Sequence, residues 1–242
     1  MTDAELSAHL ATEAGKLLLN LREQTTLDAK SLGNEGDRIA NAYLCQALRS
    51  GRPDDAVLSE EAEDRTSRCS ASRVWIIDPL DGTREYGEQR TDWAVHVALA
   101  IDGVACDGAV ALPAMGLTLS TAAPAVLKPA NSRLKMVVSR TRPAPEAVAV
   151  ANALDAELLP MGSAGAKAMA VVLGEADIYL HTGGQYEWDN CAPVAVAQAA
   201  GLHCSRIDGS PMRYNNVNPY LPDLLICRAE LAAEVLAFVK AL

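Results

Sequence analysis

The residues with the clearest capacity for chemistry follow a short apolar run, Val74 to Ile77, which is typical of a buried strand. Two carboxylates come next, Asp78 and Asp81, and Pro79 between them is expected to stop the strand. If both acids and the carbonyl of Leu80 face one centre, they form the all-oxygen environment that Mg²⁺ prefers. The segment therefore predicts a magnesium site. The alternative is an Asx-rich turn in which the acids only cap backbone amides.

The two residues after these acids, Gly82 and Thr83, indicate an anion beside the cation. Gly82 permits close approach of the backbone, and Thr83 supplies a hydroxyl group. A helix that starts here would also present free backbone amides, which bind phosphate well. The whole segment is therefore interpreted as a combined metal and phosphate site.

Further acids stand where additional metal ligands would be needed. Glu60 follows the apolar pair Val57-Leu58 and is interpreted as a ligand, whereas the acids from Glu61 to Asp64 fit a solvated loop. Asp189 precedes an alanine-rich helical stretch that ends at Gly201, so it falls at a helix N-terminus. Asp189 is thus either a helix cap or a metal ligand whose turn is held by the neighbouring indole.

The acid clusters occur in a specific order: Glu60-Glu61, then Asp78-Pro79-Leu80-Asp81-Gly82-Thr83, then Trp188-Asp189 followed by alanines. In this order they resemble the inositol monophosphatase superfamily of magnesium-dependent, lithium-sensitive phosphatases, over nearly the whole chain. The resemblance implies two or three Mg²⁺ ions. For the first ion it implies Glu60, Asp78 and the Leu80 carbonyl as ligands. For the second ion it implies Asp78, Asp81 and Asp189, and Glu60 would also contact a third.

The resemblance also implies the roles of catalytic residues. The family has an aspartate at the start of its second helix, and Asp37 matches that position, where it would pair with Thr83 to orient the attacking water. Glu60 would join them in activating that water, and Gly82 would help to bind the phosphate. Because Asp37 precedes apolar residues at helical spacing, an ordinary helix cap is the alternative for it.

The substrate is indicated by the residues after the metal motif, Arg84-Glu85-Tyr86, which resemble the CysQ-type branch of the family. That branch removes the 3′-phosphate of 3′-phosphoadenosine 5′-phosphate, and the corresponding phosphosulfate is a further expected substrate. Residues that can hold its phosphates are Asp81, Gly82, Thr83, Ser139, Arg140, Gly162, Ser163, Lys167 and Asp189. For Arg140 and Lys167, binding of the second phosphate and simple surface solvation are both open.

Two alternatives to a nucleotide phosphatase remain. A sugar phosphatase acting on inositol phosphate, fructose bisphosphate or histidinol phosphate would share the same metal core, since only peripheral residues select the substrate. A binding module that retains the cation without turnover is the second alternative. No ligand is missing from the pattern, so the module ranks last.

Composition narrows the possible partners. The net charge of −10 disfavours polymeric nucleic acid and anionic membranes, so a small phosphorylated substrate is the expected partner. The six cysteines lack CxxC spacing and the four histidines form no metal-binding pair, which argues against zinc. Cysteines in apolar stretches, without a signal peptide or a membrane-length apolar run, favour the cytoplasm. The family resemblance suggests a homodimer.

The element pattern predicts two halves. Residues 1–128 contain an amphipathic first helix, a polar loop over 30–36, a second helix and a mostly antiparallel sheet with a hairpin at Ile101-Asp102-Gly103. Residues 129–242 alternate strands and helices as an α/β half. The fold class is therefore α+β with α/β character, and the resemblance implies a layered α-β-α-β-α sandwich with the site between the halves.

Overall fold

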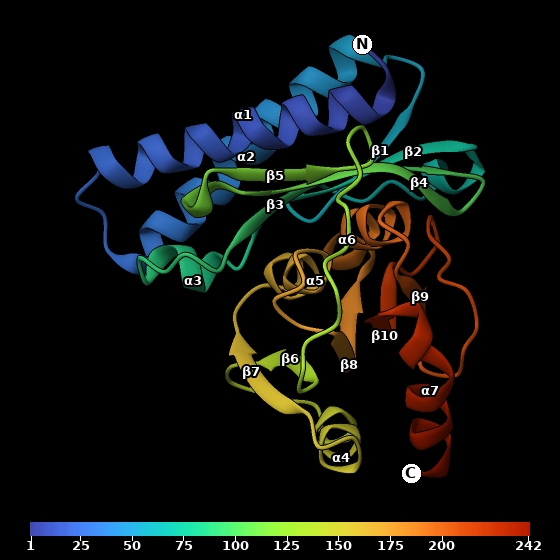
Figure 1. Cartoon of the computed structure of the whole chain (residues 1–242). Helices are drawn as coiled ribbons and strands as arrows, with labels where there is room; N and C mark the ends of the chain where they lie inside the picture. The colour runs from blue at the N-terminus through green and yellow to red at the C-terminus, as the bar shows by residue number, and fades with distance from the viewer.

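A computed structural model describes residues 1–242 and shows five layers in the order helix, sheet, helix, sheet, helix (Figure 1). The first layer holds α1 (Asp3–Gln24) and α2 (Ala29–Gly51), and the central helix layer holds α5 (Ala164–Val172) and α6 (Glu187–Ala199). The last layer holds α4 (Pro145–Ala153) and α7 (Ala232–Ala241). Three apolar cores lie between the layers: one under α1 and α2, one around the central helices and shared by both sheets, and one under α4 and α7. The predicted layered sandwich is confirmed.

The first sheet has the strand order β1-β2-β3-β4-β5. Its strands are β1 (Ala56–Ser59), β2 (Arg73–Asp81), β3 (Ala94–Ile101), β4 (Val104–Leu112) and β5 (Leu117–Ser120). Only the β1–β2 pair is parallel. The predicted hairpin joins β3 to β4, and both of its turn residues, Asp102 and Gly103, have positive φ, at 49° and 77°.

The second sheet is mixed and has the strand order β7-β6-β8-β10-β9. Its strands are β6 (Lys135–Ser139), β7 (Glu157–Met161), β8 (Ile178–Tyr186), β9 (His203–Ser205) and β10 (Tyr220–Cys227). The short helices are α3 (Thr83–Gly87), η1 (Thr66–Ser70), η2 (Pro113–Met115) and η3 (Ala229–Leu231). We propose residues 1–128 and 129–242 as the two halves, each with one sheet. None of the helices has the length and apolarity needed to cross a membrane.

The prediction of a polar loop over 30–36 was wrong, because these residues form the first turns of α2, capped by Asp28. Two glycines that resembled loop residues are needed for close packing of this helix. A Cβ on Gly33 would lie 2.7 Å from Thr83 Cγ2, and one on Gly36 would lie 2.9 Å from Leu80 Cδ2. Absence of side chains here lets α2 approach the metal motif, at a modest cost in helix propensity.

The prediction that Pro79 stops the strand was also wrong, since β2 continues to Asp81. The pairing of β2 with β3 is irregular between Asp78 and Asp81, so the proline lies at a bulge where no ladder hydrogen bond is lost. The bulge re-aims the chain between the two acids. Both carboxylates are thereby delivered to the same region at the end of the strand.

Candidate active site

Three carboxylates converge where the irregular end of β2 meets the first turn of α6. Asp78, Asp81 and Asp189 each offer an oxygen, and these oxygens lie within 4.8 Å of one another. Asp78 and Asp81 are buried, and Asp189 is half-buried. The tertiary structure thus brings together the three residues expected around one magnesium ion, although two of them are far from the third in sequence.

The raised pKa values of the acids in this cluster indicate an excess of negative charge. Burial raises the pKa of Asp78 well above its ordinary value, and the charges of Glu60 and Asp81 raise it further. Burial and the charge of Asp81 raise the pKa of Asp189 to about 6. Glu60 opens to solvent on one side, but the protein packed around it, with the charge of Asp189, raises its pKa to about 7. These acids lack enough positive charge around them.

Asp81 is the exception, because nitrogen donors surround its carboxylate. The amide of Ala164 lies 3.1 Å from Oδ1 and that of Gly165 lies 2.6 Å from Oδ2, both at the N-terminus of α5. The imidazole of His96 lies 3.1 Å from Oδ2. Burial alone would raise the pKa of Asp81, but His96 and the Gly165 amide lower it to about 2. The helix end predicted to hold a substrate phosphate thus binds an internal carboxylate.

Asp189 is held by its own helix. It is the third residue of α6, and its Oδ2 accepts a hydrogen bond from the amide of Tyr186 at 2.6 Å. The ring of Tyr186 stacks on Trp188, with ring centroids 4.8 Å apart and an angle of 8° between the planes. Aromatic stacking of this kind stiffens the turn that carries the carboxylate.

Asp37 and Thr83 lie together, with Thr83 Oγ1 3.5 Å from Asp37 Oδ1 and 3.2 Å from the Leu80 carbonyl. Asp37 is inside α2 rather than at its cap, so the helix-cap alternative does not apply. Burial raises the pKa of Asp37 to about 7, and the charge of Glu61 contributes. A buried carboxyl beside a hydroxyl and a carbonyl can hold and orient a water molecule.

Gly82 and Thr83 form the turn between the two acids of β2 and the short helix α3. Gly82 precedes α3 with φ of 89°, a conformation that disfavours any residue with a side chain. A Cβ at Gly82 would also lie 3.0 Å from Ser163 Cβ, so this turn approaches the start of α5 closely. The site therefore lies between the metal motif and the N-terminus of α5.

A cavity of about 450 Å³ adjoins Asp189 and is lined by five of the residues predicted to bind the phosphates of the substrate. Those residues are Ser139, Arg140, Gly162, Ser163 and Lys167, and the cavity is also lined by Arg84, Arg142, His181 and Gln185. Its lining is mainly polar and cationic. A small anionic molecule with one end at the carboxylate cluster would extend into this cavity.

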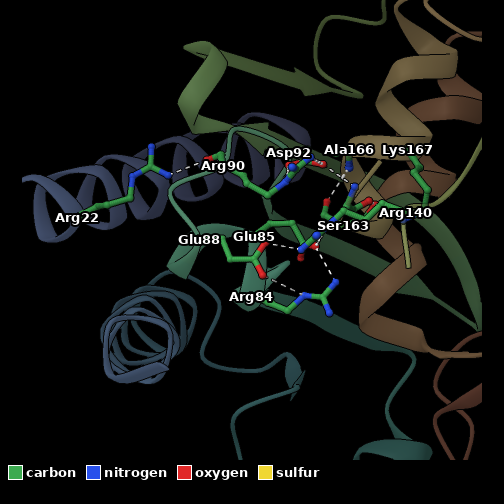
Figure 2. A network of polar contacts seen from close by, with 11 residues as sticks. Arg22, Arg84, Glu85, Glu88, Arg90, Asp92, Arg140, Ser163, Ala166 and Lys167 are labelled. Atoms are coloured by element: carbon green, nitrogen blue, oxygen red, sulfur yellow. Dashed lines mark hydrogen bonds and ion pairs between the residues drawn. The ribbon is translucent and has the colours of Figure 1, made fainter. Parts of the chain in front are cut away.

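Two of the predicted phosphate-binding cations already have partners (Figure 2). Arg140 reaches from the end of β6 to Glu85 at 2.7 Å and to Glu88 at 2.6 Å. Lys167 is buried, and its Nζ donates to the carbonyls of Gly162 at 2.6 Å and Ser163 at 2.5 Å. In this arrangement Arg140 links the end of β6 to α3, and Lys167 holds the loop before α5.

Arg142 is the exposed guanidinium that remains for an anion. It lines the cavity beside Asp189 and a neighbouring one, and no carboxylate lies within ion-pair distance of it. Sequence analysis assigned no role in the site to Arg142 or His96 and did not predict that Glu85 pairs with Arg140. The available signals were a second basic residue after the strand Lys135–Ser139 and a single histidine in the otherwise apolar run of β3.

The residues present fit Mg²⁺. The candidate donors are carboxylate and carbonyl oxygens alone, which suits a hard divalent cation. Burial and, after it, mutual repulsion raise the pKa values of Asp78, Glu60 and Asp189, and the positive charge of a bound cation would offset both. Asp78, Asp81 and Asp189 would hold one ion, and Glu60 with the Leu80 carbonyl would complete a second.

We expect the metal-free protein to unfold at a higher temperature at pH 5.5 than at pH 7.5. Carboxyls with pKa values raised from 4.5 or 3.8 to about 7 bind more protons folded than unfolded, so unfolding free energy falls as pH rises from about 4.5 through 7. His181 and His203, whose pKa values burial lowers, act in the opposite direction. Each kcal/mol corresponds to about 2–4 °C for a chain of this size.

Calorimetric melting at both pH values checks this expectation. Saturating Mg²⁺ should raise the melting temperature more at pH 7.5 than at pH 5.5, because protons compete for the ligands. Glu60→Gln should reduce the pH dependence of the metal-free protein. If the melting temperature of the metal-free protein increased between pH 5.5 and 7.5, the carboxylates would not destabilise the folded protein when they ionise.

The chain is similar to known phosphatases along most of its length. The chain is 51% identical to the 3′-phosphoadenosine 5′-phosphate phosphatase of Mycobacterium leprae, over 99% of this chain and 94% of that protein. It is 30% identical to the 3′(2′),5′-bisphosphate nucleotidase CysQ of Escherichia coli K12, over 88% and 94% of the two chains. The crystal structure of CysQ from Bacteroides thetaiotaomicron superposes with a TM-score of 0.77 at 24% identity, over 93% and 97%.

These relatives identify the chain as a phosphoric monoester hydrolase, and the cluster of Asp78, Asp81 and Asp189 can bind a metal ion. The model of the inositol monophosphatase family matches residues 3–238. The chain belongs to this family, as the order of its acid motifs predicts.

Proposed function

We propose that this protein hydrolyses the 3′-phosphate of 3′-phosphoadenosine 5′-phosphate, giving AMP and inorganic phosphate, and acts in the same way on the phosphosulfate. The observation that carries the proposal is 51% identity over 99% of the chain to a phosphatase named for this substrate. In the reaction, a water oxygen forms a bond to phosphorus while the bond to the ribose 3′-oxygen breaks. A proton from the water ends on that leaving oxygen.

Different residues of the chain have different roles in this reaction. Asp37 and Thr83 orient the attacking water, and the Glu60 carboxylate acts as the base that accepts its proton. Gly82 and Thr83 hold the phosphoryl oxygens at the start of α3. Asp78, Asp81 and Asp189 hold Mg²⁺, which when bound neutralises the phosphate charge and makes the water more acidic. The Leu80 carbonyl and Glu60 hold a further ion.

The cavity beside Asp189 would receive the rest of the nucleotide. Arg142 is the cation proposed to bind the 5′-phosphate, because its guanidinium has no internal carboxylate partner and can bind phosphate through two hydrogen bonds. The backbone amide of Arg142 donates to Ser139 Oγ at 3.2 Å, which orders the loop after β6. Ser139 and Ser163 supply hydroxyl groups, while Arg140, Gly162 and Lys167 shape the wall.

Burial lowers the pKa of His181, despite its bond to the Gly184 carbonyl, and the charges of Lys167 and Arg142 lower it further. His181 is therefore neutral at pH 7 and contributes a hydrogen bond rather than a charge to this cavity.

We further propose two or three Mg²⁺ ions per site, a homodimer, and action in the cytoplasm. The negative net charge supports a small-molecule substrate rather than a nucleic acid polymer.

The test is phosphate release in the presence of Mg²⁺ from three substrates in parallel: adenosine 3′,5′-bisphosphate, inositol 1-phosphate and fructose 1,6-bisphosphate. We expect the highest kcat/KM for the nucleotide, and loss of activity when a chelator removes the metal. A preference for either sugar phosphate would move the protein to the sugar-phosphatase branch. Absence of release from all three would support a binding module instead.

A further inference from the structure

His96 is completely buried in the middle of β3, and it is directly opposite Asp78 in the β2–β3 pairing. Directly opposed residues in a sheet share a face, so His96 points toward α5 and α6 together with that acid. The residues two positions away on the same face, Ala94 and Ala98, are small and leave room for the ring. An imidazole in such a place needs partners for both nitrogens.

The two ring nitrogens of His96 face one candidate metal ligand, Asp81, and the residue that precedes another, Asp189. Nδ1 lies 3.0 Å from the carbonyl of Trp188, the residue before Asp189, and a carbonyl only accepts, so Nδ1 carries hydrogen. Nε2 lies 3.1 Å from Asp81 Oδ2, without the alignment of a regular hydrogen bond. One rigid ring thus bridges the end of β2 and the first turn of α6.

Gly165 makes this position of the ring possible. A Cβ at residue 165 would lie 2.1 Å from His96 Nε2, which no real structure tolerates, and 3.1 Å from Asp81 Oδ2. The glycine has an ordinary helical conformation, so its lack of a side chain is not required by backbone strain. The space occupied by Nε2 therefore exists because residue 165 is glycine.

We propose that His96, seated against Gly165, is a positioning residue that holds Asp81 and the Trp188–Asp189 turn at the separation that Mg²⁺ requires. The inference rests on the metal role of these acids in the proposed function. Asp81 and Asp189 come from separate layers of the molecule, so their spacing depends on how β2 and α6 pack. A buried ring on the strand next to β2 sets that spacing directly, in the way that groups behind metal ligands commonly do.

The first test is His96→Asn, with Mg²⁺ binding measured by titration calorimetry without substrate. The Asn side chain reaches about as far as Nδ1, so it can still donate to the Trp188 carbonyl, but it has no atom at Nε2. We expect Mg²⁺ affinity to fall about 10- to 100-fold, the usual effect of removing a group behind a metal ligand. The melting temperature without metal should change little, while the rise produced by a fixed Mg²⁺ concentration should shrink.

The matched control is His203→Asn, because His203 is a half-buried histidine on β9 whose Nε2 contacts Ser205 Oγ at 2.9 Å. It lines neither the carboxylate cluster nor the cavity beside Asp189. The Mg²⁺ affinity of the His203→Asn variant should equal that of the unaltered protein. This control separates the loss of a particular contact from a general effect of replacing an imidazole with an amide.

Gly165→Ala provides an independent test of the same arrangement. Alone, the added methyl group must displace His96 and should weaken Mg²⁺ binding to a similar extent. Combined with His96→Asn, the methyl group occupies space that the ring has left. We therefore expect the double variant to bind Mg²⁺ no more weakly than His96→Asn, so that the two effects do not add.

The outcomes separate this inference from the proposed function. If the unaltered protein binds no Mg²⁺, the metal role of the carboxylates fails and the inference fails with it. If the unaltered protein binds Mg²⁺ but His96→Asn binds it equally well, only the inference is overturned. Additive losses in the double variant would also overturn it, because they would show that His96 and Gly165 act independently.

Discussion

Replacement of Asp81 by Asn is expected to lower kcat for phosphate release by about 10³-fold or more, the scale seen when a catalytic charge is removed from a preorganised site. Asp81 is the acid of the cluster whose pKa is lowered, to about 2, so it is charged at every pH at which the enzyme would act. An amide lacks that charge. It also offers one oxygen where the carboxylate accepts from both Ala164 and Gly165.

The measurement is single-substrate kinetics with adenosine 3′,5′-bisphosphate over a range of Mg²⁺ concentrations, together with a melting curve to show that the variant is folded. Asp102→Asn is the matched control, since Asp102 is in the β3–β4 turn with φ of 49°, a conformation that Asn tolerates well. The control should retain full activity. If a folded Asp81→Asn protein kept more than a tenth of the original kcat, Asp81 would not be a metal ligand.

Replacement of Arg142 by Ala is expected to change substrate preference rather than the chemical step. A charge-assisted hydrogen bond contributes about 1.5–3 kcal/mol, so KM for adenosine 3′,5′-bisphosphate should rise about 10- to 100-fold. Adenosine 3′-monophosphate has the same phosphate to be cleaved and lacks the second one. Its kcat/KM should therefore change less than about threefold, because the lost contact is with the 5′-phosphate.

Parallel kinetics with the two nucleotides test this expectation, and the ratio of their kcat/KM values is the quantity to compare. Arg133→Ala is a suitable control, because Arg133 is an exposed arginine paired with Asp155 at 2.8 Å and lies outside the cavity. An equal loss on both nucleotides would assign Arg142 to general substrate attraction. If Arg142→Ala left the ratio of the two kcat/KM values unchanged and Arg140→Ala changed it, the 5′-phosphate would be bound by Arg140 instead.

The His96–Gly165 pair and the Arg140–Glu85 pair show how the layers of this fold are joined at the site. His96 links β2 to α6 through Asp81 and the Trp188 carbonyl, while Arg140 links the end of β6 to Glu85 of α3. Both links join segments that are distant in the sequence. The separation of the carboxylates therefore depends on the packing of whole layers, and metal affinity is a sensitive measure of that packing.

The amino-acid sequence by itself determined the order of the elements and the identity of the acids at the ends of strands. These features follow from local signals: apolar runs, turn residues and the spacing of carboxylates within one segment. They sufficed to predict the hairpin at Asp102-Gly103, whereas the layered fold and the convergence of Asp78 with Asp81 and Asp189 were predicted from the resemblance of the acid motifs to a known family.

Only the tertiary structure decided which groups are partners across the layers. It placed Asp37 inside α2, because Gly33 and Gly36 pack against the metal motif instead of forming a loop. It paired Arg140 with Glu85 and Glu88, which leaves Arg142 for an anion. Such pairings depend on contacts between residues tens of positions apart, and local patterns carry no information about which buried charge meets which donor.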